Sequence, residues 1–506
     1  MKDRHFILLI LLLVVLAELP FVEYITDDTF IHLQFAKNLV AGNGFSFNSG
    51  EPTYGFTSPL WVLLISALGM TGAGLLAASK TLGLVATALS AVFFYFLVVR
   101  VSRDRFLSRA AAVVWAANAW SLRWGISGME TSIVTAWAVA SLYFFFVDSE
   151  SGSTRRSVWI LAIACLVRPE ALILLAICAV ALFLPRDSSA KRLGLPVLLS
   201  SGIVTFLWSA YAQIEFGRMT PTTVAVKAGR FISPGRLWEG LTVVGKIMGS
   251  TNAPEIALVA VVIVLSLAAR KLPGAPSRFH VAALGWLVAL PAAYVLRDVQ
   301  VVSRYLVPVM PVATLYGFLS LRRLGASLKL SERGLRRATL AVAAGCVVIN
   351  VSMLSFVEYP HTHSFSRDMR GSLVYLGKWF SINTPANTTI AIPDIGAFAF
   401  YSDRKVLDLG GLVTPGMIPI LRDHNLDEVL TQFLFAQLAR PDYVVDRSRS
   451  AMRLLGEEKL KGKILPVVST SVSSLGITRP GRFYYTAYRI DWKEFENALP
   501  TPRTGK

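Results

Sequence analysis

Long apolar runs separated by short polar segments fill the first two thirds of the chain. Most of these runs approach the roughly 20 residues that a helix needs to cross a bilayer. Clusters of Lys and Arg between them mark the cytoplasmic side of a membrane protein. Placing each cluster inside predicts about eleven spans, near residues 6–20, 75–99, 106–123, 131–148, 157–168, 170–184, 193–212, 254–270, 279–296, 304–321 and 337–357. The pattern predicts a polytopic α-helical membrane domain over residues 1–357, with a cytoplasmic N-terminus.

From about Glu358 to Lys506 the apolar runs give way to a mixed pattern typical of a soluble domain. Strand-like runs alternate with helical stretches such as residues 426–438. The expected strands cover residues 388–392, 405–409, 442–445, 464–472 and 483–490. The sequence therefore predicts an extracytoplasmic α/β domain over residues 358–506.

Composition agrees with this division, since 54% of the residues are hydrophobic and only 16% are charged. The first apolar run lacks a small-residue cleavage site, so we expect it to be retained as a helix. The net charge of +18 is spread over the inner loops and a basic C-terminal part, which argues against a nucleic-acid partner. Cys165, Cys178 and Cys346 all lie within predicted spans. They indicate neither a disulfide framework nor a zinc site.

The first outer loop, residues 21–74, carries two adjacent carboxylates, Asp27 and Asp28, just after the first span. Two acids at a water-facing membrane surface suggest proton transfer or metal binding. Either acid can cap a short helix that ends near Gly42. A second short helix is predicted to begin with Thr57 or Ser58 as cap and Pro59 at its first position.

Further charged residues fall in other predicted outer loops, so acidic and basic groups meet on one face of the membrane. Glu130 follows one span, and Arg168 and Glu170 flank Pro169 between two short apolar segments. Broken helices of this kind often mark sites inside membrane proteins. The remaining basic candidates are Lys80, Lys227, Arg230 and Arg304.

Several strings of residues carry a family resemblance. They are DDTFIHLQFAKNLVAGNGFSFNSGEPTYGFTSPLW from Asp27 to Trp61, SGMET at 127–131, VRPEA at 167–171, TPTTVAVK at 220–227, SRYLVPVMP at 303–311 and DIGAFAFYSDRKVLDLGGL at 394–412. In this order they resemble the GT-C superfamily of membrane glycosyltransferases, which use polyprenyl-phosphate sugars. The resemblance is strongest to the subgroup that includes the terminal arabinofuranosyltransferases of cell-envelope arabinan.

This resemblance implies an inverting transfer of a sugar from a polyprenyl-phosphate donor to a glycan, lipid or protein acceptor at the outer face of the cytoplasmic membrane. Asp27 matches the family's base, and Asp28 would share its site. Glu130 resembles the second-loop acid that orients the acceptor.

A phosphate leaving near the lipid surface needs cations. Arg168, Lys227 and Arg304 are the main candidates, with Lys80 and Arg230 as weaker ones. A divalent cation (Mg²⁺, Mn²⁺ or Ca²⁺) is expected on Asp28 and Glu130.

Each role has a simpler alternative. Asp27, Asp28 or Glu130 would then only cap a helix, and Arg168 would pair with Glu170 to close a hairpin. Lys227 and Arg304 would be interfacial anchors. His32, His361 and His363 are expected to be surface residues.

For the whole chain, a lipid-linked sugar transporter or flippase is the alternative, followed by a non-catalytic envelope receptor. The clustering of charges at one surface and the lack of an internal repeat favour the transferase.

Overall fold

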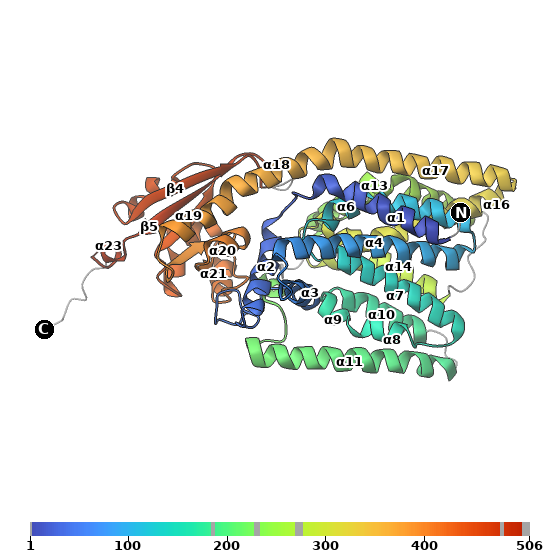
Figure 1. Cartoon of the computed structure of the whole chain (residues 1–506), viewed down its shortest axis with the longest axis horizontal. Helices are drawn as coiled ribbons and strands as arrows, with labels where there is room; N and C mark the ends of the chain where they lie inside the picture. Colours follow the sequence, from blue (N-terminus) through green and yellow to red (C-terminus); the bar gives the residue numbers. More distant parts are fainter. Residues whose placement is uncertain (1–2, 184–187, 227–232, 269–276, 476–479, 498–506) are drawn as a thin grey trace.

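A computed structural model describes residues 3–183, 188–226, 233–268, 277–475 and 480–497 of the chain. It consists of a long helical bundle with a small sheet-containing domain at one end (Figure 1). The N-terminus lies toward the opposite end of the bundle from this domain. We call the end of the bundle next to the C-terminal domain the domain end.

The bundle agrees with the predicted polytopic helical protein. Within the described residues, eight helical segments are long and apolar enough to cross a membrane. They are Asp3–Phe21, Leu75–Ser102, Thr131–Ser151, Gly194–Phe216, Pro234–Leu267, Arg278–Leu296, Ser303–Ser327 and Glu332–Asn383. Eight full-length segments are fewer than the predicted spans, because three predicted spans are shorter or broken helices.

These breaks have local causes. The predicted span over 106–123 is divided into α5 (Arg105–Ala116) and α6 (Ala119–Gly125). Asn118 starts α6 by accepting a hydrogen bond from the Ser121 amide at 3.0 Å. The predicted spans 157–168 and 170–184 are the short helices α8 (Ser157–Ala162), α9 (Ala164–Val167) and α10 (Ala171–Phe183). Pro169 cannot continue a helix, and Arg168 before it is extended, so the chain turns between α9 and α10.

The remaining helices of the first part follow the apolar pattern closely. They are α1 (Asp3–Glu18), η1 (Leu19–Phe21), α2 (Asp27–Val40), α3 (Pro59–Gly69), α4 (Leu75–Ser102), α7 (Thr131–Ser151), α11 (Ser188–Phe216), α12 (Thr222–Val226), α13 (Pro234–Ala268), α14 (Arg278–Leu296), α15 (Ser303–Leu306), η2 (Val307–Val309) and α16 (Met310–Ser327). The two short helices predicted in the first outer loop are α2 and α3, and Pro59 is the first residue of α3, as predicted.

A nearly continuous helical segment connects the bundle to the C-terminal domain (Figure 1). It comprises α17 (Glu332–Ser352), η3 (Met353–Glu358), α18 (Tyr359–Met369), η4 (Arg370–Val374) and α19 (Tyr375–Asn383), of which η3 and η4 are π-helical. The predicted domain boundary at 357/358 falls inside this segment. The helix therefore extends from the bundle into the C-terminal domain without an intervening loop.

The C-terminal domain contains one sheet with the strand order β2-β1-β3-β5-β4. Its elements are β1 (Thr389–Ile392), α20 (Gly396–Ser402), β2 (Lys405–Asp408), α21 (Met417–Asp423), α22 (Leu426–Thr431), η5 (Leu434–Gln437), β3 (Tyr443–Ser448), η6 (Arg453–Gly456), η7 (Glu458–Leu460), β4 (Ile464–Val472), β5 (Phe483–Ile490) and α23 (Trp492–Asn497). Strands β2, β1 and β3 are parallel, whereas β5 pairs antiparallel with β3 and β4. All five predicted strands are present, whereas the predicted helix over 426–438 is divided into α22 and η5.

The first loop and the C-terminal domain share one hydrophobic core. Phe30 of α2 contacts the rings of Phe400 and Tyr401, each at 5.4 Å between centroids. Asn48 exchanges two hydrogen bonds with the backbone of Val406 in β2, at 2.9 and 3.0 Å. Because these contacts join segments more than 300 residues apart, the C-terminal domain is held against α2 rather than tethered loosely.

Candidate functional site

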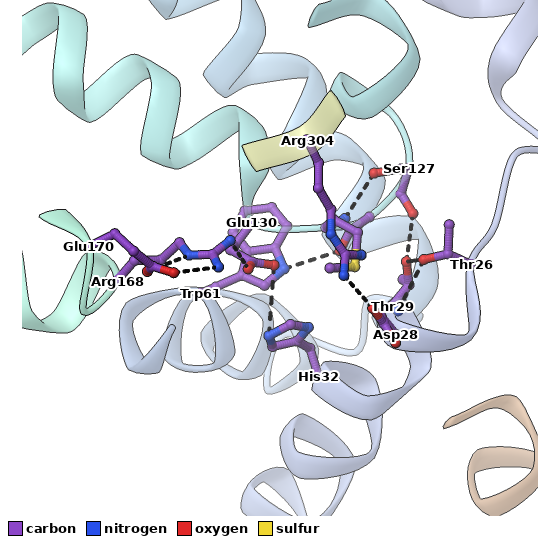
Figure 2. A network of polar contacts seen from close by, with 12 residues as sticks. Thr26, Asp28, Thr29, His32, Trp61, Ser127, Glu130, Arg168, Glu170 and Arg304 are labelled. Atoms are coloured by element: carbon purple, nitrogen blue, oxygen red, sulfur yellow. Dashed lines mark hydrogen bonds and ion pairs between the residues drawn. The ribbon is translucent and has the colours of Figure 1, made fainter. Parts of the chain in front are cut away.

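Acidic residues and arginines from four separate segments meet at the domain end of the bundle (Figure 2). Arg168 lies at the centre of one group. Its Nη1 donates a hydrogen bond to Glu130 Oε1 at 2.8 Å, while Nε and Nη2 donate to the two oxygens of Glu170 at 3.1 and 3.2 Å. The Tyr294 hydroxyl donates a further bond to Glu170 at 3.0 Å. The predicted Arg168–Glu170 pair is therefore present, and Glu130 joins it from another helix.

Glu130 occupies the position before α7, but its side chain makes no capping hydrogen bond. Its carboxylate instead faces Arg168 and is almost fully buried, with 3% of its side chain exposed. The capping alternative for Glu130 is therefore wrong. Burial opposes its charged form, but Arg168, His32 and Arg304 outweigh this effect and lower the pKa of Glu130. The acid remains ionised in this network.

A second group joins Arg304 of α15 to Asp28 of α2. Arg304 Nη2 donates to Asp28 Oδ2 at 2.6 Å, and its guanidinium lies over the rings of Trp124 and Tyr305 at 5.7 and 5.3 Å. Arg168 lies over the same Tyr305 ring at 5.5 Å. The two predicted phosphate-binding arginines therefore share an aromatic neighbour, although 136 positions separate them in the sequence (304 − 168).

The helix α2 is capped by Thr26, not by either aspartate. Thr26 Oγ1 accepts a hydrogen bond from the Thr29 amide at 3.3 Å. Asp27 and Asp28 are the first two residues of the helix, so the capping alternative is wrong for both. Since the hydroxyl of Thr26 does the capping, both carboxylates are available for other partners.

Asp27 is held by the C-terminal domain. Its two oxygens accept hydrogen bonds from the backbone amides of Gly396 and Ala397, at 3.1 and 2.8 Å. A Cβ atom on Gly396 would lie 2.0 Å from the Asp27 carbonyl oxygen, so only glycine permits this approach. Burial, with the charges of Asp394 and Asp28, outweighs the two amide bonds and raises the pKa of Asp27 to about 7.

Asp394, the first residue of the string 394–412 that carries the resemblance, lies just after β1 and supports Asp27. Asp394 accepts hydrogen bonds from Arg447 Nη1 at 2.7 and 2.8 Å and from the Tyr485 hydroxyl at 2.6 Å. The charge of Asp394 raises the pKa of Asp27. Residues that follow a parallel strand gather at the carboxyl edge of the sheet, where ligand sites form, so the position of Asp394 after β1 is typical of such a group.

His32 is buried, so the prediction that it is a surface residue is wrong. Only 5% of the residue is exposed, and its Nε2 lies 3.8 Å from Glu130 Oε2. Among the described residues, neither ring nitrogen has a hydrogen-bond partner. Burial, aided by Arg168, lowers the pKa of His32 despite the nearby acids. Its position four residues after Asp28 placed it on the same helical face, which was the missed signal.

Other polar atoms in the cluster also have unused hydrogen-bonding capacity. Within the described part of the chain, Glu130 Oε2, Thr131 Oγ1 and Arg304 Nε are buried without a hydrogen-bond partner. Buried polar groups normally have a partner, which can be a water molecule or a ligand. Arg168, Arg304, Tyr294 and Tyr305 also line a narrow cavity. The cavity has a volume of about 10 Å³, which holds a group no larger than a water molecule or a single ligand oxygen.

The weaker phosphate candidates lie apart from this cluster. Lys80 lines a different cavity, and its ammonium donates to the carbonyls of Tyr24 and Ile126 at 2.6 and 3.0 Å. Lys227 and Arg230 lie outside the described residues. The structure thus brings together Asp28, Glu130, Arg168 and Arg304, and holds Asp27 on the side of the C-terminal domain.

The described side chains do not form a cation site. Across residues 3–183, 188–226, 233–268, 277–475 and 480–497, no three His, Cys, Asp or Glu residues converge as metal ligands. Asp28 and Glu130 each face a guanidinium group, which already supplies the positive charge that a divalent ion would bring.

Sequence comparisons give one curated relative and one domain family. Over 235 residues the chain is 24% identical to the terminal β-(1→2)-arabinofuranosyltransferase of Mycobacterium tuberculosis. This match covers 43% of the chain and 37% of the mycobacterial enzyme. Residues 365–497 match a domain family of unknown function, DUF8728.

Structural comparisons cover nearly the whole chain. The oligosaccharyltransferase of Archaeoglobus fulgidus aligns over 88% of this chain and 69% of its own, with a TM-score of 0.58 and 15% identity. A second structure of that enzyme, with a TM-score of 0.54, is a complex with Zn and sulfate.

ArnT from Cupriavidus metallidurans, bound to undecaprenyl phosphate, aligns over 95% of this chain and 97% of its own, with a TM-score of 0.58 and 13% identity. The predicted resemblance is confirmed in the fold, and the weak sequence match points to the predicted subgroup. In its fold, therefore, the chain is similar to these two solved proteins, and its long apolar helices make it an integral membrane protein.

Proposed function

We propose that the chain is a glycosyltransferase that moves a sugar from a polyprenyl-phosphate donor to a glycan, lipid or protein acceptor at the outer face of the cytoplasmic membrane. One observation carries the proposal. In a GT-C fold, acids and arginines from distant segments converge where the bundle meets the C-terminal domain. The names of the mycobacterial relative and of the archaeal oligosaccharyltransferase support the same class of reaction, and ArnT is bound to a polyprenyl phosphate.

The arginines would bind the donor phosphate. Arg304 has a buried Nε without a hydrogen-bond partner among the described residues, and its Nη2 pairs with Asp28. We expect a phosphate oxygen to accept a hydrogen bond from this Nε while Nη2 keeps its bond to Asp28. Arg168 is paired with two carboxylates, and its guanidinium lies next to the Tyr305 ring, from where its positive charge would also attract the phosphate. A guanidinium near lipid, shielded from bulk water, stabilises the leaving phosphate strongly.

Asp27 would act as the base. The acceptor hydroxyl oxygen attacks the anomeric carbon of the donor, the bond from that carbon to the phosphate oxygen breaks, and the hydroxyl proton passes to the Asp27 carboxylate. The products are an inverted glycoside and polyprenyl phosphate. A pKa of about 7 suits a base that works near neutral pH. The amides of Gly396 and Ala397 orient the carboxylate, and the next residue, Asp28, pairs with Arg304.

The orientation in the membrane belongs to the same proposal. The N-terminus and the C-terminal domain lie at opposite ends of the bundle, in keeping with a cytoplasmic N-terminus and an extracytoplasmic domain. A divalent cation on Asp28 and Glu130 stays a prediction, and addition of a chelator to the transfer assay tests it.

The direct test is a transfer assay from a polyprenyl-phosphate sugar with the Asp27→Asn protein, reconstituted in lipid. We expect a loss of roughly 10²- to 10⁴-fold, as for removal of a general base. Asp423→Asn is the matched control, because Asp423 is exposed on α21. Full activity of Asp27→Asn would exclude Asp27 as the base. Movement of donor lipid across the membrane without a new glycosidic bond would favour the transporter or flippase.

A further inference from the structure

A cavity much larger than the narrow one at the candidate site lies between the bundle and the C-terminal domain. It has a volume of about 580 Å³ and is lined by the loop after η1, the start of α4, and the segment η4–α19–α20. Its charged lining residues within the described chain are Glu23, Lys80, Arg370 and Lys378. Three cations therefore face one carboxylate.

Most of this positive charge is not neutralised. Lys80 reaches the cavity from α4 and donates to two backbone carbonyls, which satisfy hydrogen bonds but carry no net charge. Arg370 pairs with Glu23 at 2.9 Å, and 46% of its side chain stays exposed. Lys378 lies 5.5 Å from the centre of the Tyr401 ring. Concave surfaces of one sign concentrate counter-ions, so this cavity attracts anions.

The approach to the cavity from the bundle is apolar. Leu19 and Val22 are 52% and 49% exposed, and both lie at the end of the first span. Tyr359 of α18 is 42% exposed, and its ring contacts Phe21 at 5.8 Å between centroids. Of these residues Val22 lines the cavity itself, so the exposed apolar side chains at the end of the first span reach the basic cavity.

From this arrangement we infer that the cavity binds the phosphate headgroup of an anionic phospholipid, whose acyl chains lie along Leu19, Val22 and Tyr359. Basic residues at a membrane surface attract anionic lipids. An apolar path that leads to the cavity favours a lipid over a free phosphate ion. The site is separate from the cluster around Arg168 and Arg304, and the inference does not depend on the proposed transfer reaction.

Native mass spectrometry of the whole protein in detergent tests this inference, with phosphatidylglycerol as the probe and phosphatidylcholine as the zwitterionic control. We expect phosphatidylglycerol to bind more tightly than phosphatidylcholine. Lys378→Gln should weaken its binding about fivefold, and Arg370→Gln combined with Lys378→Gln should weaken it further. Lys461→Gln, at an exposed position between η7 and β4 that does not line the cavity, should leave binding unchanged.

A substitution that should tighten lipid binding controls for the case in which the double substitution weakens binding only because the protein misfolds. Glu23→Gln removes the one carboxylate of the cavity and should tighten phosphatidylglycerol binding. Equal binding of the two lipids, or no change in Lys378→Gln and Glu23→Gln, would overturn the inference. Competition by millimolar inorganic phosphate that removes the lipid would show a site for free phosphate and overturn the assignment to a lipid.

Discussion

Arg168 and Arg304 both hold carboxylates at the domain end of the bundle, yet their surroundings differ. Arg168 is 9% exposed and contacts Glu130 and Glu170, which are 3% and 24% exposed. Arg304 is 14% exposed, but its partner Asp28 is 45% exposed. Breaking a buried pair leaves a charge without a partner, whereas an exposed carboxylate can turn to water. The first group is suited to hold the architecture and the second to exchange partners with a ligand.

Arg168→Met should give the largest loss of stability. It leaves the buried Glu130 and the partly exposed Glu170 without their cation, and loss of one partner of a buried pair costs about 3–5 kcal/mol. Thermal unfolding in detergent, followed by tryptophan fluorescence, measures this. A midpoint equal to that of the parent protein would contradict the structural role of Arg168.

Arg304→Met should separate the two regions most clearly. We expect a change in unfolding free energy below about 1 kcal/mol, since Asp28 can be hydrated, but a loss of transfer rate of roughly 10²- to 10³-fold. Arg304→Lys should recover only part of the rate, because lysine lacks the planar pair of donors. Parallel unfolding and transfer assays decide this. A large loss of stability with unchanged activity would reverse the roles assigned to the two arginines.

Gly396→Ala tests whether the close contact between α20 and Asp27 matters for stability and for transfer. The added Cβ would meet the Asp27 carbonyl oxygen at 2.0 Å and force α20 away from α2. We expect a cost of about 1–3 kcal/mol and a reduced transfer rate. Gly371→Ala is the control, because a Cβ there would meet nothing within 4 Å. Equal behaviour of the two variants would mean that the close approach is unimportant.

The pH dependence should be the mildest effect. Asp27, with a pKa raised to about 7 by burial and by Asp394, accepts a proton only when it is ionised. kcat/KM should therefore rise through pH 7 and fall about tenfold per unit below it. Tyr485→Phe removes one hydrogen-bond donor from Asp394 and should change the pH at which kcat/KM begins to fall. A profile that is flat between pH 5 and 8 would exclude Asp27 as the titrating group.

Much of this architecture could be predicted from periodicity alone. Apolar runs of membrane length, Pro59 at the start of α3 and the strand-like runs of β1 to β5 are local properties, so they can be recognised without knowing the partners. The points at which predicted spans break into shorter helices are harder to predict. Asn118 interrupts a predicted span because its side chain caps a new helix, and polar residues inside apolar runs give only a weak signal for this.

The charged groups of the site can be recognised in the loops between the apolar runs: Asp27, Asp28, Glu130, Arg168 and Arg304 all lie there. Their partners depend on how the helices and the C-terminal domain pack. Side chains far apart in the chain meet through packing, so no spacing rule predicts that Arg304 takes Asp28, that His32 turns toward Glu130, or that the amides of α20 hold Asp27. Burial and charge, which set the pKa of Asp27, exist only once the C-terminal domain lies against α2.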